Sequence, residues 1–263
     1  MAPIDPYAAA VTVSQPNRKS SRMPVLEVIG LSKKFGGVTA LAGVDISIDP
    51  SQITGIIGPN GSGKTTLFNT VSGLHKPTSG RVSWNGQDIT GWPAYRIARH
   101  GLIRSFQQAM SFPQLSVRDN VQIAYEHGRS RADGKSRRWD SSDHILDFIG
   151  LGAMGSEIAG TMSFGNLRRL GIAIALAADP LLLLLDEPAA GLNDSEGVEL
   201  RNLILRFPGM GIGVCLIDHD MTLMGAVCQR FVVLNFGTKI AEGPPAQVLQ
   251  DRQVLDVYLG VDL

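Results

Sequence analysis

Short apolar runs separated by polar turns follow residue 24, and they predict β-strands in the first third of the chain. The runs cover residues 26–29, 44–48, 53–57 and 81–84. The last run is followed by Asn85-Gly86, a dipeptide that favours a two-residue hairpin turn. The run at 53–57 leads into a glycine-rich turn and then into a helical pattern over 65–73, which is the order strand, phosphate-binding loop, helix.

Helical periodicity dominates the middle of the chain, roughly 93–160, and strand–helix alternation returns after residue 165. Helices are expected over 166–178, 195–207 and 246–258, and strands over 181–185, 213–217, 231–234 and 239–242. The run at 181–185 is entirely apolar, as a strand buried on both faces of a parallel sheet should be. The pattern therefore predicts an α/β protein.

Two segments lack this patterning. Residues 1–23 contain several prolines and many small residues, and we interpret them as a mobile tail before a folded domain over 24–263. The stretch 128–140 is polar and rich in arginine, and we interpret it as a solvated loop. A contact with lipid headgroups or RNA is the alternative, and no other feature of the sequence supports it.

Composition narrows the function classes. The chain has 263 residues, of which 44% are hydrophobic and 18% charged, so it is expected to fold around a sizeable core. Its 24 basic and 24 acidic residues balance, which gives no support to a nucleic-acid partner. Two cysteines exclude a disulfide scaffold. The purest apolar run, 181–185, is far shorter than the ~20 residues of a membrane-spanning helix.

The most specific motif follows the predicted strand at 53–57. It matches G-x-x-x-x-G-K-[ST] and consists of Gly58, Pro59, Asn60, Gly61, Ser62, Gly63, Lys64 and Thr65, with Thr66 next to it. The glycines let backbone N–H groups turn toward a phosphate chain, Lys64 adds charge for the β- and γ-phosphates, and the Thr65 hydroxyl can ligate Mg²⁺. The positive end of the following helix favours the same anion. These features predict a P-loop NTPase.

An acidic pair ends the apolar run at 181–185. Ligands gather at the carboxyl edge of a parallel sheet, so Asp186 is expected near the phosphate loop, where it would hold Mg²⁺ through water. Glu187 comes one residue later and can act as the general base on an attacking water molecule.

The segment 161–187 distinguishes between classes of P-loop NTPase. Residues 163–166, Ser-Phe-Gly-Asn, resemble the LSGGQ signature of ABC-type ATPases, and the Asp-Glu-Pro of 186–188 follows at the expected place. The resemblance covers about 25–260. It implies a mixed central sheet, an antiparallel β-subdomain and an inserted helical subdomain, about 93–178, that carries the signature.

The same resemblance implies further site residues. Ser163, Gly165 and Asn166 would cap the γ-phosphate of ATP bound to a second subunit. Four other residues stand in the order that the family requires: Phe35 for stacking on adenine, Gln107 of the Q-loop, Asn193 at the end of the D-loop, and the switch histidine His219. Gln108 is the alternative to Gln107. The resemblance thus implies Glu187, His219 and Gln107 as catalytic residues, and Thr65, Gln107 and Asp186 as Mg²⁺ ligands.

Within this family, the chain resembles importer ATP-binding subunits for branched-chain and other hydrophobic amino acids, or for urea and short amides. The similarity rests on KFGGV at 34–38, RSFQ at 104–107, DEPAAGLN at 186–193, DHDM at 218–221 and YLG at 258–260. Three residues depart from the usual pattern of the signature helix. Asn166 replaces glutamine, Gly171 an acidic residue and Ile174 a basic one.

The resemblance implies a peripheral position on the cytoplasmic face of the inner membrane. Two ATPase subunits would bind ATP and Mg²⁺ head to tail and act on integral-membrane permease subunits, with a solute-binding protein in the same system. The second subunit is either a copy of this chain or a sister subunit. Specificity lies in the permease, so branched-chain amino acids and another small polar solute both fit. A nonhydrolysing, regulatory subunit and an ABC ATPase that acts outside transport are the alternatives.

Overall fold

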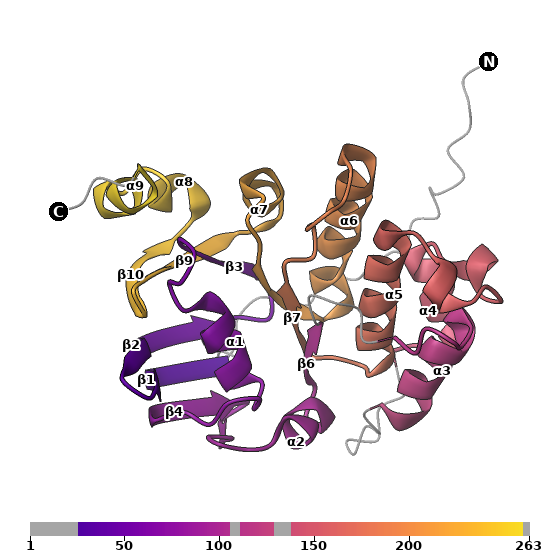
Figure 1. The fold of residues 1–263 in the computed structure, drawn as a ribbon, viewed down its shortest axis with the longest axis horizontal. Helices are drawn as coiled ribbons and strands as arrows, with labels where there is room; N and C mark the ends of the chain where they lie inside the picture. The colour runs from indigo at the N-terminus through magenta and orange to yellow at the C-terminus, as the bar shows by residue number, and fades with distance from the viewer. Residues whose placement is uncertain (1–25, 106–110, 129–137, 260–263) are drawn as a thin grey trace, which may run out of the picture.

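The computed structural model describes residues 26–105, 111–128 and 138–259. The predicted N-terminal tail and most of the arginine-rich stretch lie outside these ranges. Within them, a four-stranded and a six-stranded sheet share an apolar core, and helices flank both (Figure 1). The predicted α/β class is confirmed. In the part of the chain that is described, no helix has the length and apolar character needed to cross a membrane.

The first sheet has the strand order β2-β1-β4-β5, with antiparallel neighbours. Its strands are β1 (Leu26–Phe35), β2 (Val38–Ile48), β4 (Ser79–Trp84) and β5 (Gln87–Asp88). The hairpin turn predicted at Asn85-Gly86 is confirmed, with both residues left-handed at φ 49 and 78. β1 and β2 are longer than the apolar runs that predicted them, because register shifts interrupt the alternation of buried and exposed side chains.

The second sheet has the order β10-β9-β3-β8-β7-β6. Its strands are β3 (Ile53–Ile57), β6 (Leu102–Ser105), β7 (Leu182–Asp186), β8 (Gly213–Ile217), β9 (Arg230–Asn235) and β10 (Thr238–Gly243). Neighbouring strands are parallel except at the antiparallel pair of β9 and β10. Every residue of β3, β7 and β8 is buried, which explains why their apolar runs predicted them so well.

The helical expectation for the middle of the chain is wrong at residues 102–105, which form β6 at the end of this sheet. Only Leu102 and Ile103 are aliphatic there, and the strand continues into Arg104 and Ser105, so its apolar run is too short to recognise. β6 lies inside the range 93–178 that the family resemblance assigned to a helical subdomain.

The helices are α1 (Lys64–Val71), α2 (Ala94–Arg99), α3 (Val117–His127), α4 (Ser142–Ile149), α5 (Phe164–Ala177), α6 (Asp194–Arg206), α7 (Met221–Val227), α8 (Pro245–Val248) and α9 (Arg252–Leu259). α3, α4 and α5 pack on one another at one end of the molecule (Figure 1). The single helix expected over 246–258 is wrong, because α8 and α9 are separate. The Asp251 carboxylate accepts the Gln253 N–H at 2.8 Å and thereby starts a second helix.

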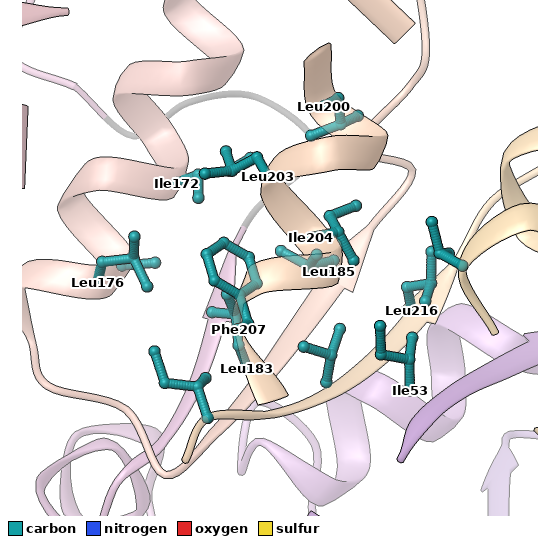
Figure 2. Close-up of a cluster of buried hydrophobic side chains, with 14 of the residues drawn as sticks. Ile53, Ile172, Leu176, Leu183, Leu185, Leu200, Leu203, Ile204, Phe207 and Leu216 are labelled. Atoms are coloured by element: carbon teal, nitrogen blue, oxygen red, sulfur yellow. The ribbon is translucent and has the colours of Figure 1, made fainter. Parts of the chain in front are cut away.

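The core has two halves, one on each face of the six-stranded sheet. Leu183 and Leu185 of β7 pack with residues of α5, α6 and the following Phe207 (Figure 2). Leu182 and Leu184 belong to the other half, which contains side chains of α1 and of the four-stranded sheet. Successive side chains of a strand point to opposite faces, so β7 is anchored on both sides up to its last residue, Asp186.

Candidate functional site

The phosphate-loop motif joins the end of β3 at Ile57 to the start of α1 at Lys64. Gly58 and Gly63 have φ values of 145 and 106, which favour glycine. A methyl carbon on Gly58 would overlap the carbonyl oxygen of Leu234 in β9, and one on Gly63 would lie 2.6 Å from the Ala40 carbonyl oxygen in β2. The loop is therefore held tightly between these two strands, and a side chain at either glycine would displace it.

The Lys64 side chain folds back over this loop. Its Nζ donates to the carbonyl oxygens of Gly58 at 2.7 Å and Pro59 at 2.9 Å. Burial lowers the pKa of Lys64, while the negative charges of Glu187 and Asp186 act to raise it. The ammonium group thus lies where the loop and the acidic pair meet.

The other loop residues differ in their access to solvent. Asn60, Gly61 and Thr65 are exposed, Pro59 and Thr66 are half-buried, and Ser62 is buried. Among the described residues, the Ser62 hydroxyl has no hydrogen-bond partner. Thr65 is exposed in the first turn of α1. The backbone N–H groups of this turn have no acceptor within the helix.

The acidic pair lies at the carboxyl ends of β7 and β8, as the sequence predicted. Glu187 has a left-handed φ of 48, a conformation that costs about 1–3 kcal/mol for a non-glycine residue. Its N–H donates to the Ile217 carbonyl oxygen at 2.7 Å, and its Oε1 lies 3.0 Å from Nε2 of His219. The structure therefore brings together Glu187 and His219, which are 32 residues apart in the sequence.

Asp218 ties the segment after β7 to the end of β8. Its carboxylate accepts the N–H groups of Ala189 and Asp220, both at 2.9 Å. Burial raises the pKa of Asp218, and these backbone N–H groups act to lower it. In the sequence, Asp218 stands out only as part of the DHDM segment at 218–221, and its supporting role is visible only in the structure.

Asp186 has a partner that the sequence did not predict. Nη2 of Arg104, in β6, lies 2.5 Å from Oδ2 of Asp186, and the Arg104 and Asp186 side chains are 8% and 5% exposed. Nη1 of the same guanidinium donates to Oδ1 of Asn69, in α1. One buried arginine therefore joins the end of β7 to the helix that follows the phosphate loop.

The signature residues lie at the start of α5. Ser163 is the N-cap, and its Oγ accepts the Asn166 N–H at 3.3 Å. Gly165 is buried against the Glu196 carboxylate, where a methyl carbon would overlap Oε1. The Asn166 side chain donates to Sδ of Met154 at 3.4 Å. α1 and α5 contribute to the two different halves of the core, so the signature and the phosphate loop lie on opposite sides of the sheet.

The D-loop end is fixed by a capping box. The Asn193 side chain accepts the Glu196 N–H, and the Glu196 side chain accepts the Asn193 N–H, both at 3.0 Å. A methyl carbon on Gly191 would lie 2.7 Å from the Phe164 ring, so the D-loop and the signature are in contact within one chain.

Comparison with known proteins identifies this arrangement. Residues 41–190 match the ABC transporter family, and the chain is 36% identical over 250 residues to the high-affinity branched-chain amino acid transport ATP-binding protein BraF of Pseudomonas aeruginosa. That similarity covers 90% of this chain and 98% of BraF. The chain belongs to the ABC transporter ATP-binding family. It is accordingly an ABC-type ATPase, as the sequence predicted.

Other comparisons agree about this ABC ATPase. It is 36% identical over 251 residues to LivG, the corresponding protein of Escherichia coli K12, with 90% of this chain and 98% of LivG covered. Residues 238–263 match a family described as branched-chain amino acid ATP-binding cassette transporter. The crystal structure of an ATP-binding cassette in its ADP conformation has a TM-score of 0.81 and 30% identity, covering 91% of this chain and all of the other.

The family resemblance predicts two further site residues, Phe35 and Gln107. Phe35 ends β1 and is 43% exposed; its ring lies edge-on to His75 at 5.2 Å, with Lys33 Nζ 4.7 Å from the ring centroid. One side of the aromatic ring is thereby supported by the protein. Gln107 and the alternative Gln108 lie outside the described residues.

The C-terminal helix also reaches the phosphate loop of the ABC ATPase. Burial raises the pKa of Tyr258 in α9, and the nearby Gly58 backbone N–H acts to lower it. The sequence singled out Tyr258 only as part of the terminal YLG, and no spacing rule links it to Gly58, 200 residues earlier.

The side chains predicted to hold Mg²⁺ have the donor chemistry that this ion prefers. The Thr65 hydroxyl and the Asp186 carboxylate are hard oxygen donors, which this ion prefers. Within the described ranges, no three His, Cys, Asp or Glu side chains gather as a metal cluster. Mg²⁺ is typically held by one or two protein oxygens together with nucleotide phosphates, so a sparse donor set of this kind suits it.

Proposed function

We propose that this chain is the ATP-hydrolysing subunit of an importer for branched-chain amino acids or a similar small polar solute. The names of BraF and LivG and the family match at 238–263 support the substrate class. The observation that carries hydrolysis is the Glu187–His219 pair, 3.0 Å apart at the sheet edge beside Lys64 and Asp186.

The phosphate loop binds the nucleotide. The present partners of the Lys64 ammonium are two neutral carbonyl oxygens, and a phosphate oxygen is a stronger, charge-assisted partner. The first N–H groups of α1 point toward the same anion. Phe35 offers an aromatic ring for stacking on the adenine, with Lys33 Nζ over the ring and His75 edge-on to it.

Thr65, Asp186 and Gln107 would hold Mg²⁺, which when bound neutralises charge on the β- and γ-phosphates. Glu187 accepts a proton from the attacking water. His219 holds Oε1 of Glu187, which restricts the carboxylate to one orientation, and its exposed ring can also contact the γ-phosphate. Positioning and electrostatic stabilisation supply most of the catalysis in phosphoryl transfer.

A second ATPase subunit completes the site. Because α1 and α5 lie on opposite faces of the sheet, Ser163, Gly165 and Asn166 are better placed to cap a nucleotide on another subunit than on their own. The further partners are integral-membrane permease subunits and a solute-binding protein, with the pair of ATPases peripheral on the cytoplasmic face of the inner membrane. No nucleic-acid partner is proposed.

The test is the solution mass of Glu187→Gln, measured by light scattering with and without ATP. Loss of the base should trap ATP, so the mass is expected to double when ATP is added. The double variant Glu187→Gln/Lys64→Ala is the control, and it should stay monomeric because its phosphate loop no longer holds the nucleotide. A Glu187→Gln chain that binds ATP and stays monomeric contradicts the paired site.

A regulatory subunit with weak turnover is the second candidate. It is favoured by Asn166, whose side chain is held by Met154 of its own chain rather than extended from the signature. Steady ATP hydrolysis by the purified wild-type chain, lost in Glu187→Gln, would exclude it.

A further inference from the structure

Arg104 joins two parts of the site, the end of β7 and α1. It lies in β6, and the chain reaches Gln107 only three residues later. One guanidinium nitrogen bonds Oδ2 of Asp186 at 2.5 Å, and another bonds Oδ1 of Asn69. Asn69 lies in α1, five residues after Lys64. Strands β6 and β7 are also paired directly, with Arg104 opposite Leu184.

A buried ion pair of this kind is weak support for stability by itself, because removing two charges from water offsets most of their attraction. The geometry of this ion pair instead fixes the orientation of the Asp186 carboxylate relative to α1. The planar fork of an arginine presents donors at set angles, and here two of them go to different elements rather than both to one carboxylate. Rotation of the Asp186 carboxylate would break the bond to Nη2, and displacement of α1 would break the bond to Nη1.

We propose that Arg104 is a positioning residue for Mg²⁺, acting through Asp186. It fixes the rotamer of the carboxylate through its bond to Oδ2, and it couples that carboxylate to α1 through its bond to Asn69. The inference rests on the proposed function, since it takes Asp186 as the residue that holds the metal. Groups that orient a metal ligand commonly affect metal affinity by about 10–100-fold.

The test measures ADP affinity of the full chain by calorimetry, once in excess EDTA and once in excess Mg²⁺. ADP is used because it is not hydrolysed. The variant Arg104→Lys keeps the charge and removes the fork. We expect its affinity in EDTA to match wild type, and the gain in affinity on adding Mg²⁺ to fall by about tenfold.

The matched control is Arg138→Lys. Arg138 forms another buried ion pair, with Nη1 2.6 Å from Oδ1 of Asp179, and it belongs to neither the phosphate loop nor the acidic pair. The same substitution there should leave the Mg²⁺ effect unchanged. Asn69→Ala is the second variant, for use if Arg104→Lys does not fold. It removes the other anchor of the guanidinium and should reduce the Mg²⁺ effect in the same direction.

The outcomes separate the two proposals. If wild type binds ADP more tightly with Mg²⁺, and Arg104→Lys and Asn69→Ala respond equally to the metal, the role of Arg104 is overturned and the proposed function stands. If either variant gains more affinity from Mg²⁺ than wild type does, Arg104 competes with the metal, which also overturns it. If wild type binds no ADP, the proposed function fails and this inference fails with it.

Discussion

A single methyl group at Gly58 is expected to damage the phosphate loop, because that carbon would overlap the Leu234 carbonyl oxygen. We expect Gly58→Ala to lower the free energy of unfolding by about 3 kcal/mol and to weaken ADP binding. Urea unfolding and calorimetry measure the two effects. The control is Gly197→Ala in α6, where no atom lies within 4 Å and φ is ordinary. That substitution should stabilise the chain by about 0.5–1 kcal/mol and leave ADP binding intact.

Asp218 gives the fold a pH dependence of definite sign. Burial raises the pKa of its carboxyl, so the folded chain keeps this proton to a higher pH than the unfolded chain does. Its contribution to stability is therefore fully present below the unfolded pKa and is lost as the pH rises through the folded one. Relative to Asp218→Asn, the free energy of unfolding of wild type should fall as the pH rises from below the ordinary aspartate pKa of about 3.9 to above the raised pKa of the folded chain. A difference that is constant or grows over this range would contradict the shift.

At the scale of elements, the start of α6 serves both stability and the site. Asn193→Ala removes the capping box and should lower the free energy of unfolding by about 1 kcal/mol. Because Asn193 also ends the D-loop, the rate of ATP hydrolysis should fall. Ser141→Ala removes a comparable cap, whose Oγ accepts the His144 N–H at 3.1 Å at the start of α4. It should cost similar stability without slowing hydrolysis, and equal slowing in both variants would mean that stability alone is responsible.

The elements that the sequence predicted best are those in which every side chain is buried. β3 and β8 have the predicted bounds because all of their residues are buried. β6 was missed because half of its four residues are polar. One of them, Arg104, is polar because it forms the ion pair with Asp186. The last helix was predicted as one because an aspartate at 251 does not interrupt apolar spacing, although it caps a new helix.

The site was predictable where it depends on a contiguous motif and unpredictable where it depends on tertiary contact. The phosphate loop and Asp186-Glu187 follow from local order of strand, loop and helix. Arg104 bonds Asn69 and Asp186, 35 and 82 residues away, and no periodicity connects them. Tyr258 against Gly58 is a contact of the same kind.

At the scale of the whole molecule, the two halves of the core are expected to unfold together, because β7 contributes to both. Leu183 and Leu184 are fully buried and pack on opposite faces of the sheet. Leu183→Ala and Leu184→Ala should each lower the free energy of unfolding by about 2–5 kcal/mol. Circular dichroism and tryptophan fluorescence should report one coincident urea transition in each variant. Two separated transitions in either one would show that the halves unfold independently.

The alternating leucines of β7 also determine when the Asp186 carboxylate acquires its direction. A strand packed on both faces cannot rotate about its own axis without opening both halves of the core. The direction in which its last side chain leaves the backbone is therefore set when the chain folds. The entropic cost of orienting the Asp186 carboxylate is therefore incurred during folding, before any nucleotide binds. Under the proposed function, ATP hydrolysis would then begin from a carboxylate that is already oriented.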